Sequence, residues 1–503
     1  MIFYVAEMWL DTLAYLYTVT LGGLAVYALH VVILIILYLL RRHKPSPPLP
    51  PLAEERLPNV TVQVPLRNEA YVVQRILSAV TALDWPRDRL EIQVLDDSDD
   101  ETTALIRDEL AKEHAQGAIT TLYHRHHATD HKAGALAAGL EHAQGEYIAI
   151  FDADFCPPAD FLHRTVPYLV ADDTLGMVQA RWGHLNAEYS AITRAQALLL
   201  DAHFTVEHIA RNRSGLLINF NGTAGVWRRK TIEDAGGWQG DTVAEDLDLS
   251  YRAQLKGWQA LYLPDVVAPA ELPPLITAFK QQQYRWAKGS AQCLRKLGGS
   301  ILRSSRLRWH QKAMALLHLS GYITQPMFLM LLLLILPITC HSEMVQPSDV
   351  APYPPHLATL TALLGTVTAI PSLLYLLGQT AHYQDWPRRI LYYPLLMALG
   401  LGITWSSTLA LIDGFLHWGG PFTRTPKFRL KGREGHWKHT QYRAPLDNTL
   451  PGEIFVALYA GVTVWQVYRL KQASFMPFSL IYLCGITLVL GGILRLVLFT
   501  KKH

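Results

Sequence analysis

The separation of a charged stretch from several long apolar stretches is the strongest constraint on how this chain folds. Residues 45–310 are rich in Asp, Glu, Arg and His, whereas most of the remaining sequence consists of apolar runs. The first run, 13–40, is long enough to cross a bilayer as a helix and too long for the core of a signal peptide, and no small-residue cleavage site follows it. We therefore expect a retained membrane anchor at 1–44 and a folded domain at 45–310.

Basic clusters beside the apolar runs predict which parts of the chain face the cytoplasm, because Lys and Arg are enriched in cytoplasmic loops. The cluster at 41–44 places the following domain in the cytoplasm, and the basic stretch 423–443 places a loop at 419–445 on the same side. Lys501 and Lys502 predict a cytoplasmic end as well. The sequence thus predicts an integral multi-pass protein of the cell inner membrane, in contact with membrane lipids.

Sidedness limits the number of crossings in the region 311–503. Three apolar segments separate the domain from residue 423, yet an even number must cross between two cytoplasmic parts. The segment 390–416 is the least lipid-like because it contains Pro394, Asp413, glycines and serines, so we expect it to be interfacial or re-entrant. The prediction is five crossings, one before the domain and four after it, near 13–40, 313–340, 356–378, 450–468 and 475–499.

Charge and cysteine content exclude several classes of function. The net charge is only +3, which gives no general case for binding nucleic acid. The four cysteines are scattered without a CxxC spacing, so they indicate neither a disulfide framework nor a zinc site.

Strand and helix patterns alternate through the first half of the domain. Short alternating or apolar runs predict strands, and apolar residues at helical spacing predict the helices between them. Such alternation builds a parallel sheet with right-handed crossovers, in which charged clusters at strand ends meet at one edge. The predicted strands are 60–65, 92–95, 147–150 and 178–182, and the predicted helices are 71–83, 101–115 and 132–143.

Two carboxylates follow the apolar run 147–150. Residues two apart in an extended backbone point to the same side, so Asp152 and Asp154 present their oxygens together. Hard oxygen ligands suit Mg2+ or Mn2+ held jointly with substrate phosphates. Taken alone, such a pair is more often a solvated acidic turn.

Other charged residues follow the first strands in the same way. Arg67 and Glu69 come after the first strand, and Asp97 lies in an acidic cluster that either contacts a nucleotide or only ends a strand and caps a helix. Lys132 begins a helix, where it is either a diphosphate ligand helped by the helix dipole or a solvated surface lysine.

Two further motifs lie in the second half of the domain. Glu245 and Asp246 are adjacent acids, and Gln282, Arg285 and Trp286 share one face of a probable helix. An arginine and a tryptophan near a membrane are equally typical of interfacial packing.

In this order, the motifs resemble those of the membrane-bound family 2 glycosyltransferases, which include cellulose, hyaluronan and chitin synthases. The stretches 83–90, 93–101 and 220–227 are most similar to plant cellulose-synthase-like mannan and xyloglucan-backbone synthases. The segment 422–427 resembles the cytoplasmic gating loop of processive synthases. The resemblance implies a cytosolic GT-A-type domain, with a Rossmann-like mixed α/β sheet, joined to an α-helical transmembrane domain.

The resemblance also implies a role for each motif. Asp97 would contact the nucleoside, with Arg67, Glu69, Lys132 and Arg285 around the nucleotide sugar. Asp152 and Asp154 would bind Mg2+ or Mn2+ and the diphosphate. Asp246 would be the general base, beside Glu245. Gln282 and Trp286 would meet the acceptor, and Phe422, Thr425 and Lys427 would form the gating loop.

The expected reaction is inverting transfer of a hexose from UDP-glucose or GDP-mannose to a growing β-glycan that is extruded across the membrane. An alternative is a non-processive glycolipid synthase, similar to ceramide or diacylglycerol glucosyltransferases, with a lipid acceptor. A third possibility is a transporter with a degenerate transferase domain. The gating-like segment favours the first, and the sequence leaves the donor and any partner subunit open.

Overall fold

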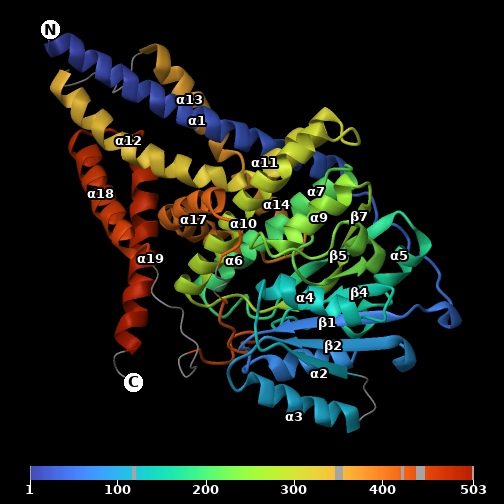
Figure 1. The fold of residues 1–503 in the computed structure, drawn as a ribbon. Coiled ribbons are helices and arrows are strands. Elements are labelled where there is room, and N and C mark those ends of the chain that lie inside the picture. Colours follow the sequence, from blue (N-terminus) through green and yellow to red (C-terminus); the bar gives the residue numbers. More distant parts are fainter. Residues whose placement is uncertain (1, 116–119, 346–354, 421–423, 438–447, 501–503) are drawn as a thin grey trace.

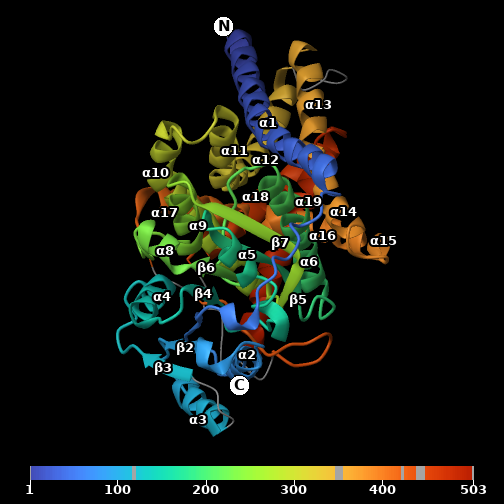
Figure 2. The ribbon, with the colours of Figure 1, turned by 90° about the vertical axis from the view of Figure 1, so that its right-hand side faces the viewer.

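The computed structural model describes residues 2–115, 120–345, 355–420, 424–437 and 448–500. An α/β body lies on one side and long apolar helices lie on the other (Figure 1). Seen from a direction at right angles, helices α1 and α13 are again at the opposite end from the strands β2 and β3 (Figure 2). The predicted combination of a mixed α/β sheet with several apolar helices is therefore confirmed.

A seven-stranded sheet forms the centre of the α/β body, with the order β3-β2-β1-β4-β6-β5-β7. Strand β6 runs antiparallel to β4 and β5, and the other pairs are parallel. The strands are β1 Val60–Leu66, β2 Leu90–Asp96, β3 Thr120–His124, β4 Tyr147–Ile150, β5 Leu175–His184, β6 Gly225–Arg228 and β7 Gln259–Ala270. The four strands expected from the sequence are β1, β2, β4 and β5.

Helices connect the parallel strands as the sequence pattern predicts. In α2 (Val73–Thr81), Ile76, Leu77 and Val80 are fully buried against the sheet, because they recur at the spacing of one helical face. The remaining helices of the body are α3 Thr102–Ala115, α4 His131–His142, α5 Val166–Ala171, α6 Ala191–Ala202, α7 His208–Arg213, α8 Arg229–Asp234, α9 Glu245–Leu255, α10 Ile276–Arg303 and α11 Trp309–Leu319.

Five helical segments among the described residues are long and apolar enough to cross a membrane, which makes the chain a multi-pass membrane protein candidate. They are 11–41, 321–341, 359–380, 450–469 and 476–496, and they belong to α1 Ile2–Arg41, α12 Thr324–Val345, α13 Pro355–Ala369 with α14 Ser372–Thr380, α18 Leu450–Arg469 and α19 Met476–Thr500. These segments match the five predicted crossings by length and composition.

The segment that the sequence set apart, 390–416, is bent. Helix α15 (Trp386–Arg389) precedes the segment, and helices α16 (Tyr393–Gly402) and α17 (Thr404–Leu416) form most of it. The chain turns by 50° at the break before Thr404. Counted as one broken span it would raise the number of candidate crossings to six, and as a re-entrant segment it leaves five.

Helix α10 links the α/β body to the apolar helices. A Cβ atom added to Gly414 of α17 would lie 2.5 Å from the carbonyl oxygen of Lys288, so the two helices touch through a glycine. The ammonium of Lys288 lies 2.7 Å from a carboxylate oxygen of Asp413 on α17. Further along α10, the buried ammonium of Lys280 lies 2.7 Å from the buried carboxylate of Glu453 on α18. These contacts hold α10 against α17 and α18, two of the apolar helices.

Candidate active site

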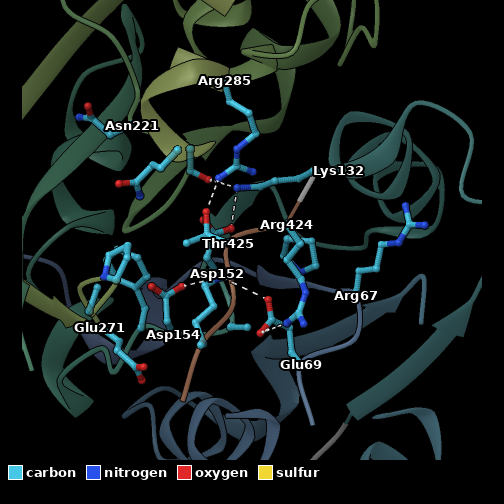
Figure 3. Close-up of a pocket in the computed structure, with 18 of the residues that line it drawn as sticks. Arg67, Glu69, Lys132, Asp152, Asp154, Asn221, Glu271, Arg285, Arg424 and Thr425 are labelled. Carbon is cyan, nitrogen blue, oxygen red and sulfur yellow. Dashed lines mark hydrogen bonds and ion pairs between the residues drawn. The ribbon is translucent and has the colours of Figure 1, made fainter. Parts of the chain in front are cut away.

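A pocket lies where β1, β2, β4 and β5 end, and it is closed by α9, α10 and the segment 424–427 (Figure 3). Parallel strands bring their carboxyl ends to one edge, so residues that follow different strands become neighbours. Of the site residues predicted from the sequence, all in the described part of the chain line this pocket; Phe422 lies outside the described residues. The lining residues in question are Arg67, Glu69, Asp97, Lys132, Asp152, Asp154, Glu245, Asp246, Gln282, Arg285, Trp286, Thr425 and Lys427.

Lys132 connects the acidic groups on one side of the pocket. Its ammonium lies 2.6 Å from Oδ1 of Asp152 and 4.0 Å from Oε1 of Glu245, and it donates a hydrogen bond to the carbonyl of Gly222 at 2.8 Å. Burial alone would lower the pKa of Lys132, but the charges of Asp152 and Glu245 outweigh it and raise the pKa. Lys132 is therefore a fixed positive charge at the centre of the site.

A second charged group lies across the pocket. Arg424 contacts Glu69 at 2.8 Å, and Lys427 lies 3.3 Å from Glu69 and 3.2 Å from Oδ1 of Asp154. Burial raises the pKa of Glu69, against the opposing effect of the two cations. Figure 3 shows Arg424 and Glu69 side by side next to Asp154. The positive charges of Arg424 and Lys427 thus lie beside the carboxylates of Glu69 and Asp154, which follow strands β1 and β4.

Glu245 and Asp246 begin helix α9 at the wall of the pocket. Burial, followed by the like charge of Glu245, raises the pKa of Asp246 to about 7. Gly222 faces this carboxylate with a φ of +80°, and a Cβ atom there would lie 3.0 Å from Oδ2 of Asp246. The position therefore requires glycine both for its left-handed backbone and for the space beside Asp246.

Helix α10 contributes the remaining wall. Gln282, Arg285 and Trp286 all line the pocket from this helix, as expected from their spacing. Arg285 donates a hydrogen bond to the hydroxyl of Thr425 at 2.7 Å, and the guanidinium points into the pocket (Figure 3). Burial lowers the pKa of Arg285, partly offset by Glu245 and Asp152.

Asp97 also lines the pocket and has a partner that the sequence did not suggest. The guanidinium of Arg125 donates to both carboxylate oxygens of Asp97, at 2.7 and 2.6 Å. Arg125 follows β3, a strand absent from the sequence prediction. Because of this bidentate pair, Asp97 is held in one orientation beside Arg67 and His131, which also line the pocket.

Glu271 and Arg424 line the pocket as well, and neither was predicted. Glu271 follows β7, so the rule that charged residues after strands converge would have found it had that strand been recognised. Arg424 lies within the segment 422–427 that resembles a gating loop, but the resemblance gave a role only to Phe422, Thr425 and Lys427.

The donor set of the pocket fits a hard divalent cation only in part. Among the described residues, no group of three or more His, Cys, Asp or Glu side chains has the arrangement of a complete metal site. Asp152 and Asp154 supply two carboxylates two positions apart, and each lies beside an ammonium group, that of Lys132 and that of Lys427. Two carboxylates suit Mg2+ or Mn2+ when substrate phosphates supply further oxygens.

Residues 58–289 match the family described as glycosyltransferase like family 2, so this part of the chain is a family 2 glycosyltransferase domain. The chain is homologous to plant glucomannan 4-β-mannosyltransferases. It is 44% identical over 262 residues to glucomannan 4-beta-mannosyltransferase 1 of Oryza sativa subsp. japonica, covering 51% of this chain and 50% of that protein. It is 38% identical over 327 residues to glucomannan 4-beta-mannosyltransferase 7 of Arabidopsis thaliana, covering 63% of this chain and 59% of that protein. The matches thus span about half to three fifths of these relatives.

A solved structure supports the fold. A mannosyltransferase of Pyrobaculum calidifontis, in complex with GDP-Man and Mn2+, superposes with a TM-score of 0.52 and covers 81% of this chain and 99% of that chain. The two sequences are 21% identical, so the similarity establishes a GT-A-like fold.

Proposed function

We propose that this chain is a membrane-bound inverting hexosyltransferase that adds mannose from GDP-mannose to a growing β-linked glycan. The observation that carries the proposal is the pocket itself. It combines a buried carboxylate whose pKa is about 7, Asp246, with five lysine and arginine side chains that can meet a diphosphate. The names of the homologous plant proteins support mannose as the sugar, and the GDP-Man complex of the archaeal neighbour is consistent with a guanosine donor.

In the proposed reaction, the acceptor hydroxyl oxygen forms a bond to the anomeric carbon while the bond from that carbon to the diphosphate breaks. Asp246 takes the proton of the hydroxyl, and a positioned base contributes about 10²–10⁴-fold. The leaving nucleoside diphosphate gains negative charge, so cations that strengthen their contacts at this stage lower the barrier. Lys132 and Arg285 face the acidic side of the pocket, where they would stabilise that charge.

Asp152 and Asp154 would hold Mg2+ or Mn2+, which when bound neutralises part of the diphosphate charge. Trp286 would offer a flat apolar face to the acceptor sugar and leave its hydroxyl groups free to react. Thr425 and Lys427 would form the part of the gating segment that closes over the donor, since both already line the pocket.

The membrane part fits a polymerising enzyme. Nucleotide sugars are soluble in the cytosol, so the proposal places the pocket on the cytoplasmic side, as the basic residues at 41–44 indicate. Helix α10 joins the pocket wall to α17 and α18, so product that leaves beside Trp286 would enter the membrane helices directly. We propose that they pass the glycan across the membrane.

The test uses inverted membrane vesicles that contain the full chain, Mn2+ and radiolabelled GDP-mannose or UDP-glucose. Label from GDP-mannose in an alcohol-insoluble pellet, released by a β-mannanase, would support the proposal. Label that partitions only into organic solvent would refute polymer synthesis and identify a glycolipid synthase. Incorporation from UDP-glucose alone would refute the choice of donor.

Two controls make the assay specific for the pocket. Asp246→Asn preserves the shape of the side chain and removes the base, so incorporation should be lost while donor binding persists. A chelator should abolish incorporation, and added Mn2+ should restore it. Turnover by Asp246→Asn would remove this residue from the base role.

A further inference from the structure

The segment 424–430 lines the pocket with its first residues and contacts the α/β body with its last ones. Its first part lines the pocket through Arg424, Thr425 and Lys427. Its second part is buried: Phe428 is 4% exposed and Leu430 is 0% exposed. The pocket-facing part is therefore followed immediately by an anchored part.

Glu271 holds the anchored part with both of its carboxylate oxygens. The backbone N–H of Phe428 donates to Oε1 at 2.7 Å, and the backbone N–H of Leu430 donates to Oε2 at 3.0 Å. The side chain of Glu271 is 1% exposed, so these bonds form in a water-poor environment where charge-assisted hydrogen bonds are strong.

Arg75, on helix α2, completes the arrangement from the other side. Its guanidinium donates to Oε2 of Glu271 at 3.1 Å and to the carbonyl of Leu430 at 3.5 Å. It also donates to the backbone carbonyl of Asp154 at 3.4 Å. One arginine thus connects the carboxylate of Glu271, the anchored part of the segment and the residue that follows β4.

The backbone between the two bonded amides has an uncommon conformation. Arg429 has a φ of +59°, which a residue with a side chain adopts only where its surroundings impose it. This turn directs two nearby N–H groups toward one anion, an arrangement that binds carboxylates and phosphates in other proteins. In this chain the anion is the side chain of Glu271.

We infer that Glu271 is a positioning residue for the gating segment. Lys427 directly precedes the anchored Phe428, so fixing the backbone at Phe428 limits where the Lys427 ammonium can go. The clamp formed by Glu271 and Arg75 holds that ammonium at the strand ends and Thr425 beside Arg285. The inference rests on the proposed function, because donor retention is what the positioned segment would provide.

A direct contact of Glu271 with donor or cation is the competing interpretation. Oε2 already accepts from Leu430 and Arg75, whereas Oε1 accepts from Phe428, so Oε1 is the oxygen that this role would use. The two interpretations differ in the donor-free protein: only a clamp protects the amides of Phe428 and Leu430 when no substrate is present.

The experiment is hydrogen exchange, resolved at single amides, on the purified full chain in lipid nanodiscs without substrate. Glu271→Gln keeps the size of the side chain but offers only one acceptor oxygen. We expect exchange at Phe428 or Leu430 to be faster by about tenfold or more, the loss expected for one charge-assisted bond. Unchanged exchange at both amides would overturn the inference.

Glu188→Gln is the matched control, because Glu188 contacts the same region through Arg433 at 3.7 Å but is largely exposed. This variant should leave exchange at Phe428 and Leu430 at the wild-type rate. In the activity assay, Glu271→Gln should raise the KM for the donor by about tenfold with a smaller change in kcat. A merely structural role would reduce the active fraction and leave KM unchanged, which would overturn the inference.

Failure of the proposed function would be visible separately. If the wild-type chain transfers no sugar, the proposed function falls, and the exchange measurement still decides whether Glu271 clamps the segment. If Glu271→Gln altered the metal dependence of transfer but left hydrogen exchange at Phe428 and Leu430 unchanged, Glu271 would be a direct ligand and the clamp would be refuted.

Discussion

Lowering the pH should remove the activity through Asp246. Burial and the neighbouring charge of Glu245 raise the pKa of Asp246 to about 7, so the carboxylate is the main form above this pH and the neutral acid is the main form below it. A general base must be deprotonated to accept a proton. At pH 8 about nine tenths of the molecules carry the base, and at pH 6 about one tenth do, so kcat/KM should fall roughly tenfold between them.

Glu245→Gln tests the cause of this pH dependence. The substitution removes the like charge beside Asp246 and keeps the shape of the side chain, so the pKa of Asp246 should fall. The acidic limb of the pH profile should then move to lower pH, and the variant should retain more of its activity at pH 6 than the wild type. The desolvation contribution remains, so the limb should not return to the ordinary range of an exposed aspartate.

The assay is the initial rate of label incorporation from subsaturating GDP-mannose at constant ionic strength, over about three pH units. Subsaturating donor is needed because kcat/KM reports the groups of the free enzyme, and the pKa of about 7 belongs to the donor-free pocket. A wild-type profile that stays flat between pH 6 and pH 8 would refute the reasoning. An acidic limb of the pH profile that does not shift in Glu245→Gln would refute it as well.

Two further predictions concern other charges. Lys427→Met should increase the affinity of the donor-free chain for Mn2+ roughly tenfold, because the ammonium 3.2 Å from Asp154 no longer competes for the carboxylate. Electron paramagnetic resonance would measure this affinity, and equal Mn2+ affinities of variant and wild type would contradict the prediction. Lys280→Met should lower the free energy of unfolding by about 3–5 kcal/mol, because it leaves the buried carboxylate of Glu453 unpaired. Thermal unfolding in nanodiscs would measure the second effect, and the double variant with Glu453→Gln should recover most of it.

The strands and helices in the first half of the α/β body could be predicted from the sequence, because each has its own local residue pattern. The strands at 60–65, 92–95 and 147–150 have clear alternating or apolar patterns, and the helix between the first two has one apolar face. Because parallel strands end at one edge of a sheet, the sequence alone predicts that Asp97, Asp152 and the residues after β1 lie close together. The structure adds the side-chain pairing, such as that of Asp97 with Arg125.

The missed strands have weak local signals and depend on their neighbours in the sheet. Strand β7 contains Pro264 and Pro269, which argue against a strand when the sequence is considered alone. In the structure its pairing with β5 shifts register between Ala180 and Arg181, and Arg181 donates to the carbonyl of Pro264 at 2.9 Å. Strand β6 has only four residues and runs antiparallel, so no helix–strand alternation indicates it.

Residues from the segment 424–430 were the hardest to place, because their acidic partners lie between 157 and 358 positions earlier in the chain. Arg424 and Lys427 contact Glu69, and Phe428 and Leu430 contact Glu271. No local pattern encodes such contacts. The resemblance to the gating loop of a known family supplied Thr425 and Lys427, but it offered nothing for Glu271, which is why the clamp emerges only from the structure.

The charge balance of the pocket explains why donor and divalent cation should bind together. Seven acids and five lysine or arginine side chains line the pocket. Ion pairs join Lys132 to Asp152 and Glu245, Arg424 to Glu69, and Lys427 to Glu69 and Asp154. A donor that enters alone adds negative charge to a partly buried site that already holds more acids than lysine and arginine side chains, and a cation that enters alone must displace an ammonium group. When both enter, the diphosphate can attract Lys427 and Arg424 away from the carboxylates, which frees Asp154 for the cation. The same basic groups therefore contact the carboxylates before binding and the diphosphate after it. Bound cation should raise the affinity for the donor, and bound donor should raise the affinity for the cation by the same factor.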